Sequence, residues 1–270
     1  MVPITAQRPL SRADRIAGIA KGLAVLESFD TERQRLNATL AAERAGLSRA
    51  AARRHLLTLE HLGYLESDGA YFWLAPRVLR VAGSYFASAR LPRLVRPTLA
   101  RLSAVLRAPT SVAVLDGAEV VIVAASGAEL SAAAAGLTAP RLLAYGLHLG
   151  ARLPAHATST GRVLLAALGD AELRRWLAAH PIARLTPRTL IARKEWLGAV
   201  AQARAQDWCL SSEEHELGVH ALAVPLRGAH GRTLAALNVI ASPAQLTAGE
   251  LHREALPRLL EAAGQLRELL

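Results

Sequence analysis

The sequence predicts an α+β protein of two domains, an N-terminal winged helix-turn-helix and a larger domain with a largely antiparallel sheet flanked by helices. Three observations predict it. The chain has 270 residues, which is long enough for two domains. Residues 15–75 contain two short helical patterns separated by a Gly-Leu-Ser turn and followed by a hairpin signal. Beyond residue 108, strand-like and helix-like runs do not alternate regularly, which favours an antiparallel sheet over a doubly wound one.

The first elements follow from apolar spacing and capping residues. Residues 1–14 are polar and are expected to form a flexible N-terminus. From Arg15, apolar residues recur at helical spacing as far as Phe29, which predicts a helix of about four turns. Thr39 is the predicted N-cap of a short helix over Leu40–Ala45.

The next helix is the one expected to enter the DNA groove. Gly46 suits the left-handed conformation that ends the preceding helix. Ser48 is the predicted N-cap of a helix over Arg49–Leu62, and Gly63 closes it. Two helices joined by so short a turn are typical of the helix-turn-helix motif.

A hairpin is predicted directly after that helix. Tyr64–Ser67 and Tyr71–Leu74 alternate in polarity as short strands do, and Asp68-Gly69 between them is a two-residue hairpin signal. A hairpin that follows a recognition helix is a wing. The succession of these elements is far more specific than any one of them.

Residues 76–107 are predicted to be a basic helical linker, with one helix over Arg77–Ala89 and another beginning near Pro92. The whole chain carries a net charge of +10, and this segment contains no acidic residue. DNA would explain such a concentration of positive charge. Equally, arginine stems can lie along an amphipathic helix and keep it soluble. The basic residues are Arg77, Arg80, Arg90, Arg93, Arg96, Arg101 and Arg107.

The larger domain is expected to span residues 108–270. Its predicted strands are Ser111–Leu115, Val120–Ala125, Leu142–Leu147, Trp208–Ser211, Val219–Leu226 and Leu234–Ile240. Its predicted helices are Thr160–Leu168, Ala171–His180, Lys194–Gln206 and Thr247–Leu269.

The start of the recognition helix carries the groups expected to contact double-stranded operator DNA. Arg49 and Arg53 can each present a guanidinium fork to a guanine edge, and Ser48 and Arg54 can bind phosphate. The small side chain of Ala50 lets the helix lie close to the groove floor. The predicted DNA-binding residues are Ser48, Arg49, Ala50, Arg53, Arg54, His55 and Tyr71.

Composition excludes several other classes. No apolar run approaches the roughly 20 residues of a membrane span, and the N-terminus lacks a long apolar signal segment. The single cysteine, Cys209, excludes an internal disulfide framework. The nine histidines show no zinc-site spacing, so we expect no metal and no cofactor. A cytoplasmic location fits these features.

Several runs of residues, spread over about residues 15–270, resemble the IclR family of bacterial regulators. Within the family the chain resembles the branch that controls protocatechuate and 4-hydroxybenzoate catabolism through the β-ketoadipate pathway. The runs are Leu47–Tyr64, the Phe72 to Leu79 stretch with its Pro76-Arg77, Gly150–Ala166, Glu213–Val219 and Ala235–Val239.

The resemblance implies a GAF-like effector domain, a homodimer or dimer of dimers, and a small organic acid, aromatic or dicarboxylic, as effector. Carried over position by position, it implies effector-binding residues Ser159, Thr160, Ser211, Ala221, Asn238 and Ile240. Ser159 and Thr160 also begin a helix, where hydroxyls and free N–H groups suit a carboxylate. The alternative for this pair is ordinary helix capping.

The chain departs from the family pattern at a few positions. Asp207 stands where a glycine is usual, and Arg227-Gly228 replaces an aromatic and acidic pair. Ser211 replaces a common acidic residue, and Ala221 a common small or thiol residue. These changes concern the ligand and leave the DNA-binding half unaffected.

A hydrolase is the alternative from another class. Ala157-Thr-Ser-Thr-Gly161 leads into a helix and faintly resembles a nucleophile elbow with Ser159 as nucleophile, followed by Asp207 and then His220 or His230. Alanine replaces the first glycine of that motif and no apolar strand directly precedes it, so we do not expect an enzyme. A metal-sensing regulator and a regulator without a ligand are the remaining alternatives.

Overall fold

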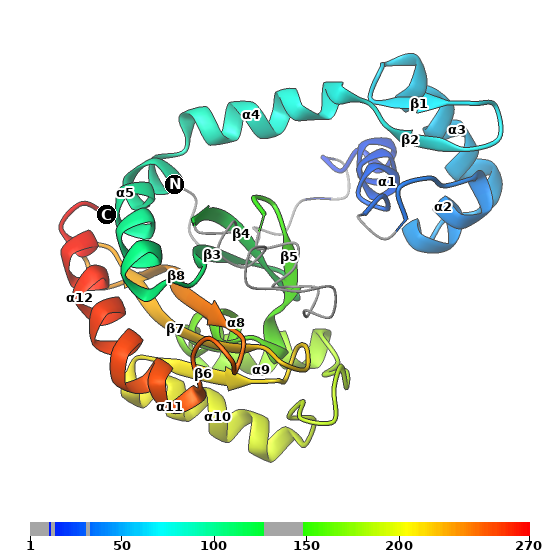
Figure 1. The fold of residues 1–270 in the computed structure, drawn as a ribbon. Coiled ribbons are helices and arrows are strands. Elements are labelled where there is room, and N and C mark those ends of the chain that lie inside the picture. The colour runs from blue at the N-terminus through cyan, green and yellow to red at the C-terminus, as the bar shows by residue number, and fades with distance from the viewer. Residues whose placement is uncertain (1–10, 12–13, 31–32, 127–147) are drawn as a thin grey trace. The chain divides into compact units, whose positions relative to one another are not determined.

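The structure is a computed structural model that describes residues 11, 14–30, 33–126 and 148–270. The chain divides into two compact units, one reaching to Ala89 and the other running from Arg90 to Leu270 (Figure 1). Nearly all of the expected flexible N-terminus, residues 1–14, lies outside the described residues, and so does the expected strand Leu142–Leu147. No helix in the described ranges is long and apolar enough to cross a membrane.

The smaller unit is a helical cluster followed by a wing. Its elements are α1 (Ala17–Leu26), α2 (Ala38–Ala45), α3 (Arg49–His61), β1 (Leu65–Ser67), β2 (Phe72–Leu74), a 3-10 turn (Pro76–Val78) and α4 (Leu79–Ser88). The strands pair antiparallel, and Leu36 adds a bridge to Phe72. The buried core is Val25, Phe29, Leu36, Ala41, Ala42, Ala52, Leu56, Leu65 and Phe72.

Two helix predictions in this unit need correction. Helix α1 is shorter than four turns: it starts at Ala17 and ends at Leu26, before Phe29. The N-cap of α2 is Asn37 and not Thr39, because the Asn37 side chain accepts from the backbone N–H groups of Thr39 and Leu40.

The wing loop is longer than the two residues predicted. The last strand pair is Ser67 with Phe72, so four residues, 68–71, connect the strands. Asp68 determines this loop, because its carboxylate accepts from the N–H groups of Ala70 and Tyr71 at 3.0 and 2.8 Å.

The larger unit has a six-stranded sheet in which every neighbouring pair is antiparallel, in the order β5-β4-β3-β8-β7-β6. The strands are β3 (Thr110–Asp116), β4 (Glu119–Ser126), β5 (Arg152–Pro154), β6 (Cys209–Ser212), β7 (His220–Arg227) and β8 (Thr233–Ala241). The predicted antiparallel sheet is therefore confirmed. Strand β5 was not predicted, since Pro154 ends it after three residues.

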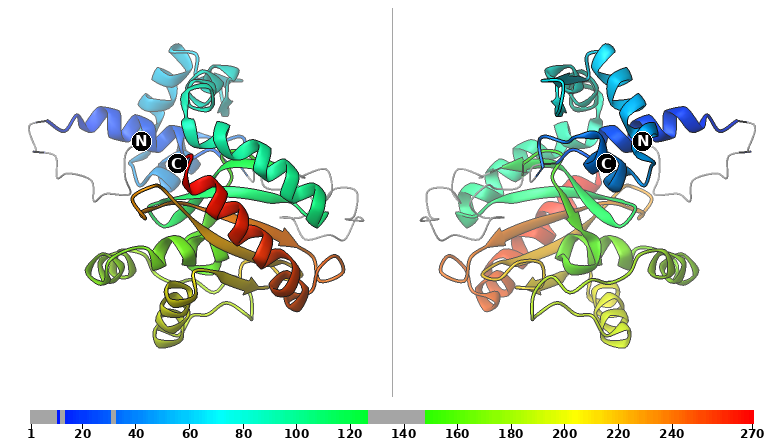
Figure 2. Two further views of the ribbon diagram at one scale, coloured as in Figure 1. Left: turned by 90° about the vertical axis from the view of Figure 1, so that its left-hand side faces the viewer. Right: turned by 90° about the vertical axis from the view of Figure 1, so that its right-hand side faces the viewer.

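Helices cover both faces of this sheet, as Figures 1 and 2 show. One face carries α5 (Arg90–Leu106) and α12 (Leu256–Arg267). They share a core with Leu222, Val224 and Leu226 of β7 and Ala235, Leu237 and Val239 of β8. The other face carries α8 (Ser159–Ala166), α9 (Asp170–Ala179) and α10 (Arg193–Gln206). Alternate residues of β7 and β8 point to the two cores, as the strand period requires.

Helix α5 begins at Arg90 rather than near Pro92, and it belongs to the larger unit. Its apolar stripe is buried against the sheet because Leu91, Val95 and Leu99 recur at helical spacing. This part of the predicted linker therefore also belongs to the core of the larger unit.

The C-terminal helix is interrupted, contrary to the single helix expected over Thr247–Leu269. It comprises α11 (Ala248–Glu250), a π-helical segment (Leu251–Ala255) and α12. Pro257, in the first turn of α12, has no N–H to donate, and the wider π turn immediately before it accommodates the missing bond.

Two departures from the family pattern meet in space. Asp207 ends α10 in the left-handed conformation, at a φ of 60°, which asparagine and aspartate tolerate better than most residues. Its carboxylate accepts two hydrogen bonds from the Arg227 guanidinium, at 2.6 and 2.7 Å. The arginine lowers the pKa of Asp207. The pair ties the end of α10 to the end of β7.

Candidate DNA-binding surface and effector pocket

The turn before α3 has the geometry of a helix-turn-helix. Gly46 has a φ of +63°, and the N–H of Leu47 donates to the carbonyl of Ala42 at 2.9 Å. Ser48 is the N-cap, and its hydroxyl accepts from the N–H of Ala51 at 3.3 Å. These contacts fix where α3 begins and which of its faces is buried.

Helix α3 has one buried face and one exposed face. Ala52 and Leu56 have no exposed surface and pack into the core of the smaller unit. Ser48, Arg49, Ala50, Arg53 and Arg54 are exposed. Arg49 and Arg53 lie one turn apart and share a face, which can enter a major groove.

The other two predicted DNA contacts have different environments. His55 is half-buried, with its ring near Gly22 of α1, so it faces a neighbouring helix more than solvent. Tyr71 is 42% exposed at the tip of the wing. The structure therefore presents six of the seven predicted residues on the surface.

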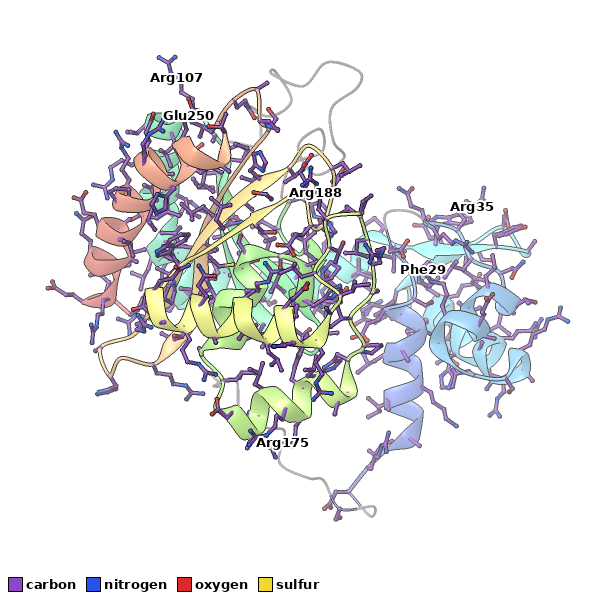
Figure 3. The ribbon with its side chains drawn as sticks, turned by 90° about the horizontal axis from the view of Figure 1, so that it is seen from below. Phe29, Arg35, Arg107, Arg175, Arg188 and Glu250 are labelled. Atoms are coloured by element: carbon purple, nitrogen blue, oxygen red, sulfur yellow. The ribbon has the colours of Figure 1, made fainter. Side chains whose placement is uncertain are left out.

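Arg35 is a wing residue that the sequence analysis missed. Its guanidinium lies 4.8 Å from the ring centre of Trp73 and 5.8 Å from that of Tyr71, and it forms an ion pair with Asp68. Figure 3 shows it beside the wing strands. Arg35 precedes α2 in sequence and reaches the wing only through the bridge of Leu36 to Phe72, so no local pattern indicated it.

In the larger unit, all six predicted effector-binding residues line one small cavity, with a volume of about 20 Å³ for the centres of water-sized molecules. Ser211, Ala221 and Ile240 are consecutive partners across β6, β7 and β8. The complete lining is Leu153, Ala157, Thr158, Ser159, Thr160, Ser211, Glu214, His215, Glu216, Val219, Ala221, Asn238 and Ile240.

Helix α8 begins at this cavity, one residue earlier than predicted. Its N-cap is Thr158, whose hydroxyl accepts from the N–H of Gly161 at 3.2 Å, so neither Ser159 nor Thr160 is the cap. Ser159 has no exposed surface, and its Oγ has no hydrogen-bond partner in the described part of the chain. A buried hydroxyl without a partner at a helix N-terminus suits an anionic ligand.

Close packing holds this helix in place. A Cβ atom on Gly161 would lie 2.0 Å from the carbonyl oxygen of Ala155, so only glycine fits. On the sheet side, the Ser111 hydroxyl hydrogen-bonds to the Oδ1 atom of Asn238. The Asn238 amide N–H₂ group keeps its donors for other partners.

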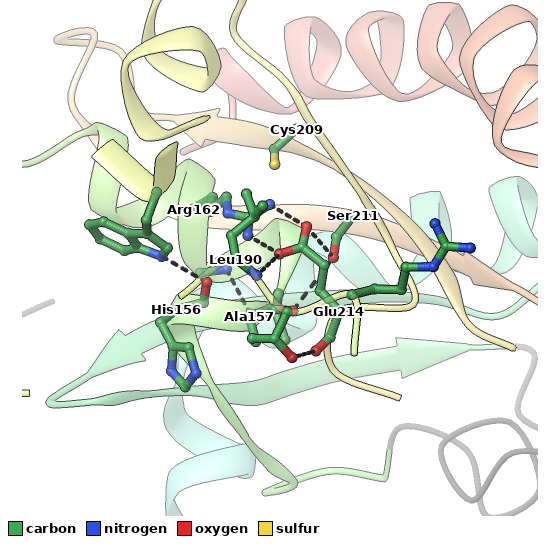
Figure 4. Close-up of polar contacts among 12 residues, drawn as sticks. His156, Ala157, Arg162, Leu190, Cys209, Ser211 and Glu214 are labelled. Carbon is green, nitrogen blue, oxygen red and sulfur yellow. Dashed lines mark hydrogen bonds and ion pairs between the residues drawn. The ribbon is translucent and has the colours of Figure 1, made fainter. Parts of the chain in front are cut away.

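A buried ion pair supports the floor of the cavity (Figure 4). The Arg162 and Glu214 side chains are 2% and 9% exposed, and Arg162 donates through both terminal nitrogens, one at 2.6 Å. The Ser211 hydroxyl lies 3.4 Å from the same carboxylate. Glu214 lies in an acidic run, and such runs are usually solvated. Its partner Arg162 is distant in sequence and reaches it only in the folded chain. Burial raises the pKa of the nearby Cys209 thiol to about 11.

The geometry gives the hydrolase alternative no support. Asp207 is paired with Arg227, and His230 is exposed in the turn between β7 and β8. The Ser159 hydroxyl has no base within hydrogen-bond distance among the described residues. Nor do three metal-binding side chains gather anywhere in that part of the chain.

Comparison with known proteins follows the same division into units. The profile of the IclR helix-turn-helix domain matches residues 18–69, and that of the bacterial transcriptional regulator IclR C-terminal domain matches residues 83–268. The chain is 48% identical to the Pca operon regulatory protein of Acinetobacter baylyi over 266 residues, covering 98% of this chain and 93% of that one.

Two further relatives are named for aromatic acids. The p-hydroxybenzoate hydroxylase transcriptional activator of Acinetobacter baylyi is 47% identical over 95% of this chain and 92% of its own length. A crystal structure of a double mutant of the PobR inducer-binding domain from Acinetobacter, in complex with 3-hydroxybenzoic acid, is 41% identical. It superposes with a TM-score of 0.61 and covers 67% of this chain and 100% of that one.

Proposed function

Because the chain belongs to the IclR family of bacterial transcriptional regulators, with a helix-turn-helix and a C-terminal effector domain, we propose that its operator binding is controlled by an aromatic carboxylic acid. The acid occupies the cavity at the start of α8. Its carboxylate meets the Ser159 hydroxyl and the positive end of the helix. The observation that carries this proposal is the buried, unpartnered Ser159 Oγ in that cavity.

The relatives support an aromatic effector. One is a Pca operon regulatory protein, another is a p-hydroxybenzoate hydroxylase transcriptional activator, and the double mutant of the PobR inducer-binding domain is in complex with 3-hydroxybenzoic acid. For this chain we therefore propose a role in aromatic acid catabolism, carried out in the cytoplasm where the operator DNA lies. Paired recognition helices of a homodimer or a dimer of dimers read the operator, since two-fold operators match two-fold proteins.

On the DNA side, Arg49 and Arg53 read base edges, while Ser48 and Arg54 contact phosphate. Ala50 lies against the groove floor, His55 positions the helix against α1, and Tyr71 contacts the backbone from the wing. Ligand binding shifts the balance between two arrangements of the DNA-binding units, which needs a differential affinity of only a few kcal/mol.

A gel shift with the intergenic DNA upstream of the chain's own gene tests the proposal. Arg53→Ala is expected to weaken operator binding by about tenfold or more, because a bidentate arginine contact contributes about 1–3 kcal/mol. Arg175→Ala, an exposed arginine on α9, removes the same charge elsewhere and should leave binding nearly unchanged.

The ligand half is tested by calorimetry with 4-hydroxybenzoate, 3-hydroxybenzoate and protocatechuate. Ser159→Ala is expected to reduce affinity for the acids while operator binding without ligand stays intact. If none of these acids binds and none alters the gel shift, the effector proposal is wrong and only the DNA-binding assignment stands.

A further inference from the structure

The effector pocket holds a second buried polar atom without a partner. His215 lines the same cavity as Ser159, and its Nδ1 atom is shielded from solvent with no hydrogen-bond partner among the described residues. Leaving such an atom unpaired costs free energy that a suitable ligand group can recover. Ser159 and His215 can therefore each pair with a polar group of a ligand in this cavity.

The charges around the two positions differ. Glu214 and Glu216 flank His215 and also line the cavity. A ligand carboxylate placed here would lie close to the Glu214 carboxylate, which is already paired with Arg162. The start of α8 has no acidic residue in its first turn and presents the positive end of the helix dipole. A carboxylate is accordingly directed to Ser159, and the ligand's other polar group is left for His215.

The protonation state of His215 determines which ligand group pairs best with its imidazole ring. Burial lowers the pKa of its imidazole, so the ring is neutral near pH 7. A neutral imidazole has one donor and one acceptor nitrogen, and a hydroxyl can likewise donate and accept. A carboxylate can only accept, which makes it the poorer partner for this ring.

The remaining lining is partly apolar. Leu153, Val219, Ala221 and Ile240 contribute no polar side-chain atom to the cavity, while Thr158, Thr160, Ser211 and Asn238 do. A planar hydrocarbon ring can lie against the apolar part of this surface.

We infer that His215 pairs with the ring hydroxyl of a hydroxylated aromatic carboxylate and determines the preference of the pocket for that class over the non-hydroxylated acid. This inference rests on the proposed function of the cavity and names the feature of the ligand that the cavity recognises. His215 is then a specificity residue. It lies in the acidic run after β6 and directly follows Glu214, which is paired with Arg162.

The test is calorimetric titration of the full chain with 4-hydroxybenzoate, 3-hydroxybenzoate and benzoate. The wild-type chain is expected to bind one of the hydroxylated acids about tenfold or more tightly than benzoate, as one well-formed hydrogen bond allows. In His215→Phe that ratio should fall to within about threefold, mainly through weaker binding of the hydroxylated acid. His215→Gln, which keeps a donor and an acceptor, should retain part of the preference.

Ser159→Ala is the matched control, because it removes the other unpartnered polar atom and should weaken all three acids by similar factors. A His215→Phe chain that keeps the wild-type ratio overturns the inference while the proposed function survives. If that variant does not fold, as judged by circular dichroism, the ratio in His215→Ala decides: an unchanged ratio overturns the inference. Wild-type chain that binds none of the acids overturns both proposals.

Discussion

On α3 the arginines proposed to contact DNA are exposed, whereas the polar groups proposed to hold the effector are buried in the larger unit. Removing an exposed arginine takes away no packing, so binding can change while stability does not. In the cavity, by contrast, Ser159 and Asn238 are 0% and 3% exposed and lie in the same core that holds the sheet to α8. On α3, DNA recognition is therefore separable from folding. In the cavity, the same residues serve both ligand recognition and folding.

The largest expected effect comes from breaking the buried ion pair beneath the cavity. Arg162→Met leaves the buried Glu214 carboxylate without its partner, which typically destabilises a protein by about 3–5 kcal/mol. Urea unfolding of the larger unit, followed by tryptophan fluorescence, measures this. Arg152→Met is the control, since its ion pairs with Asp116 and Glu119 are exposed and are each expected to contribute at most about 1 kcal/mol.

Next is the close approach of α8 to Ala155. Gly161→Ala requires a backbone shift and is expected to destabilise the larger unit by roughly 3 kcal/mol and to weaken ligand binding as well. Gly198→Ala, in the exposed middle of α10 with open space around it, should instead stabilise by up to about 1 kcal/mol. Similar melting temperatures for the two variants would contradict the packing argument.

A smaller effect is expected in the DNA-binding unit, where capping matters more than burial. Asn37→Ala removes two side-chain bonds at the start of α2 and should destabilise that unit by about 1 kcal/mol. Thr39→Ala, at an exposed position two residues later, should have almost no effect. Hydrogen exchange of α2 amides distinguishes the two variants, and equal protection would mean that Asn37 is not the functional cap.

The smallest effect expected is a dependence of stability on pH that is confined to the larger unit. Burial lowers the pKa of His156, His215 and His220, so the unfolded chain binds more protons than the folded one in mildly acidic solution. Stability should therefore be complete above about pH 6.5, the ordinary histidine value, and fall as the pH drops towards 5. Unfolding midpoints at pH 7 and 5 measure this, with His156→Gln expected to reduce the slope.

The parts of this molecule that were predictable from sequence are those fixed by local chemistry. Gly46 and Ser48 set the turn and the start of α3, and alternating apolar residues identified β7 and β8 to within one residue at each end. The six pocket positions came from the family resemblance, and they do line one cavity. Local patterns sufficed for the turn and the strands, because those features depend on neighbours in the chain, whereas the pocket positions required the resemblance.

The parts that were missed depend on residues distant in sequence. Arg162 and Glu214 are 52 residues apart, and nothing near either one indicates that both become buried together. The same holds for Arg35, which stacks on Trp73 of the wing. The N-cap predicted at Thr39 was wrong by two residues, since adjacent hydroxyl and amide side chains compete for the same N–H groups. The capping alternative for Ser159 and Thr160 also fails, because Thr158 is the cap.

The bond between Asp207 and Arg227 has a consequence for protein engineering. A chimaera that exchanges segments with another family member between these two positions would inherit only one half of the pair. Asp207 alone would keep an unfavourable left-handed backbone without its compensating cation, and Arg227 alone would lose its anchor on α10. Crossover points for building hybrid sensors from this chain therefore belong before residue 207 or after residue 227, with the intervening stretch transferred whole.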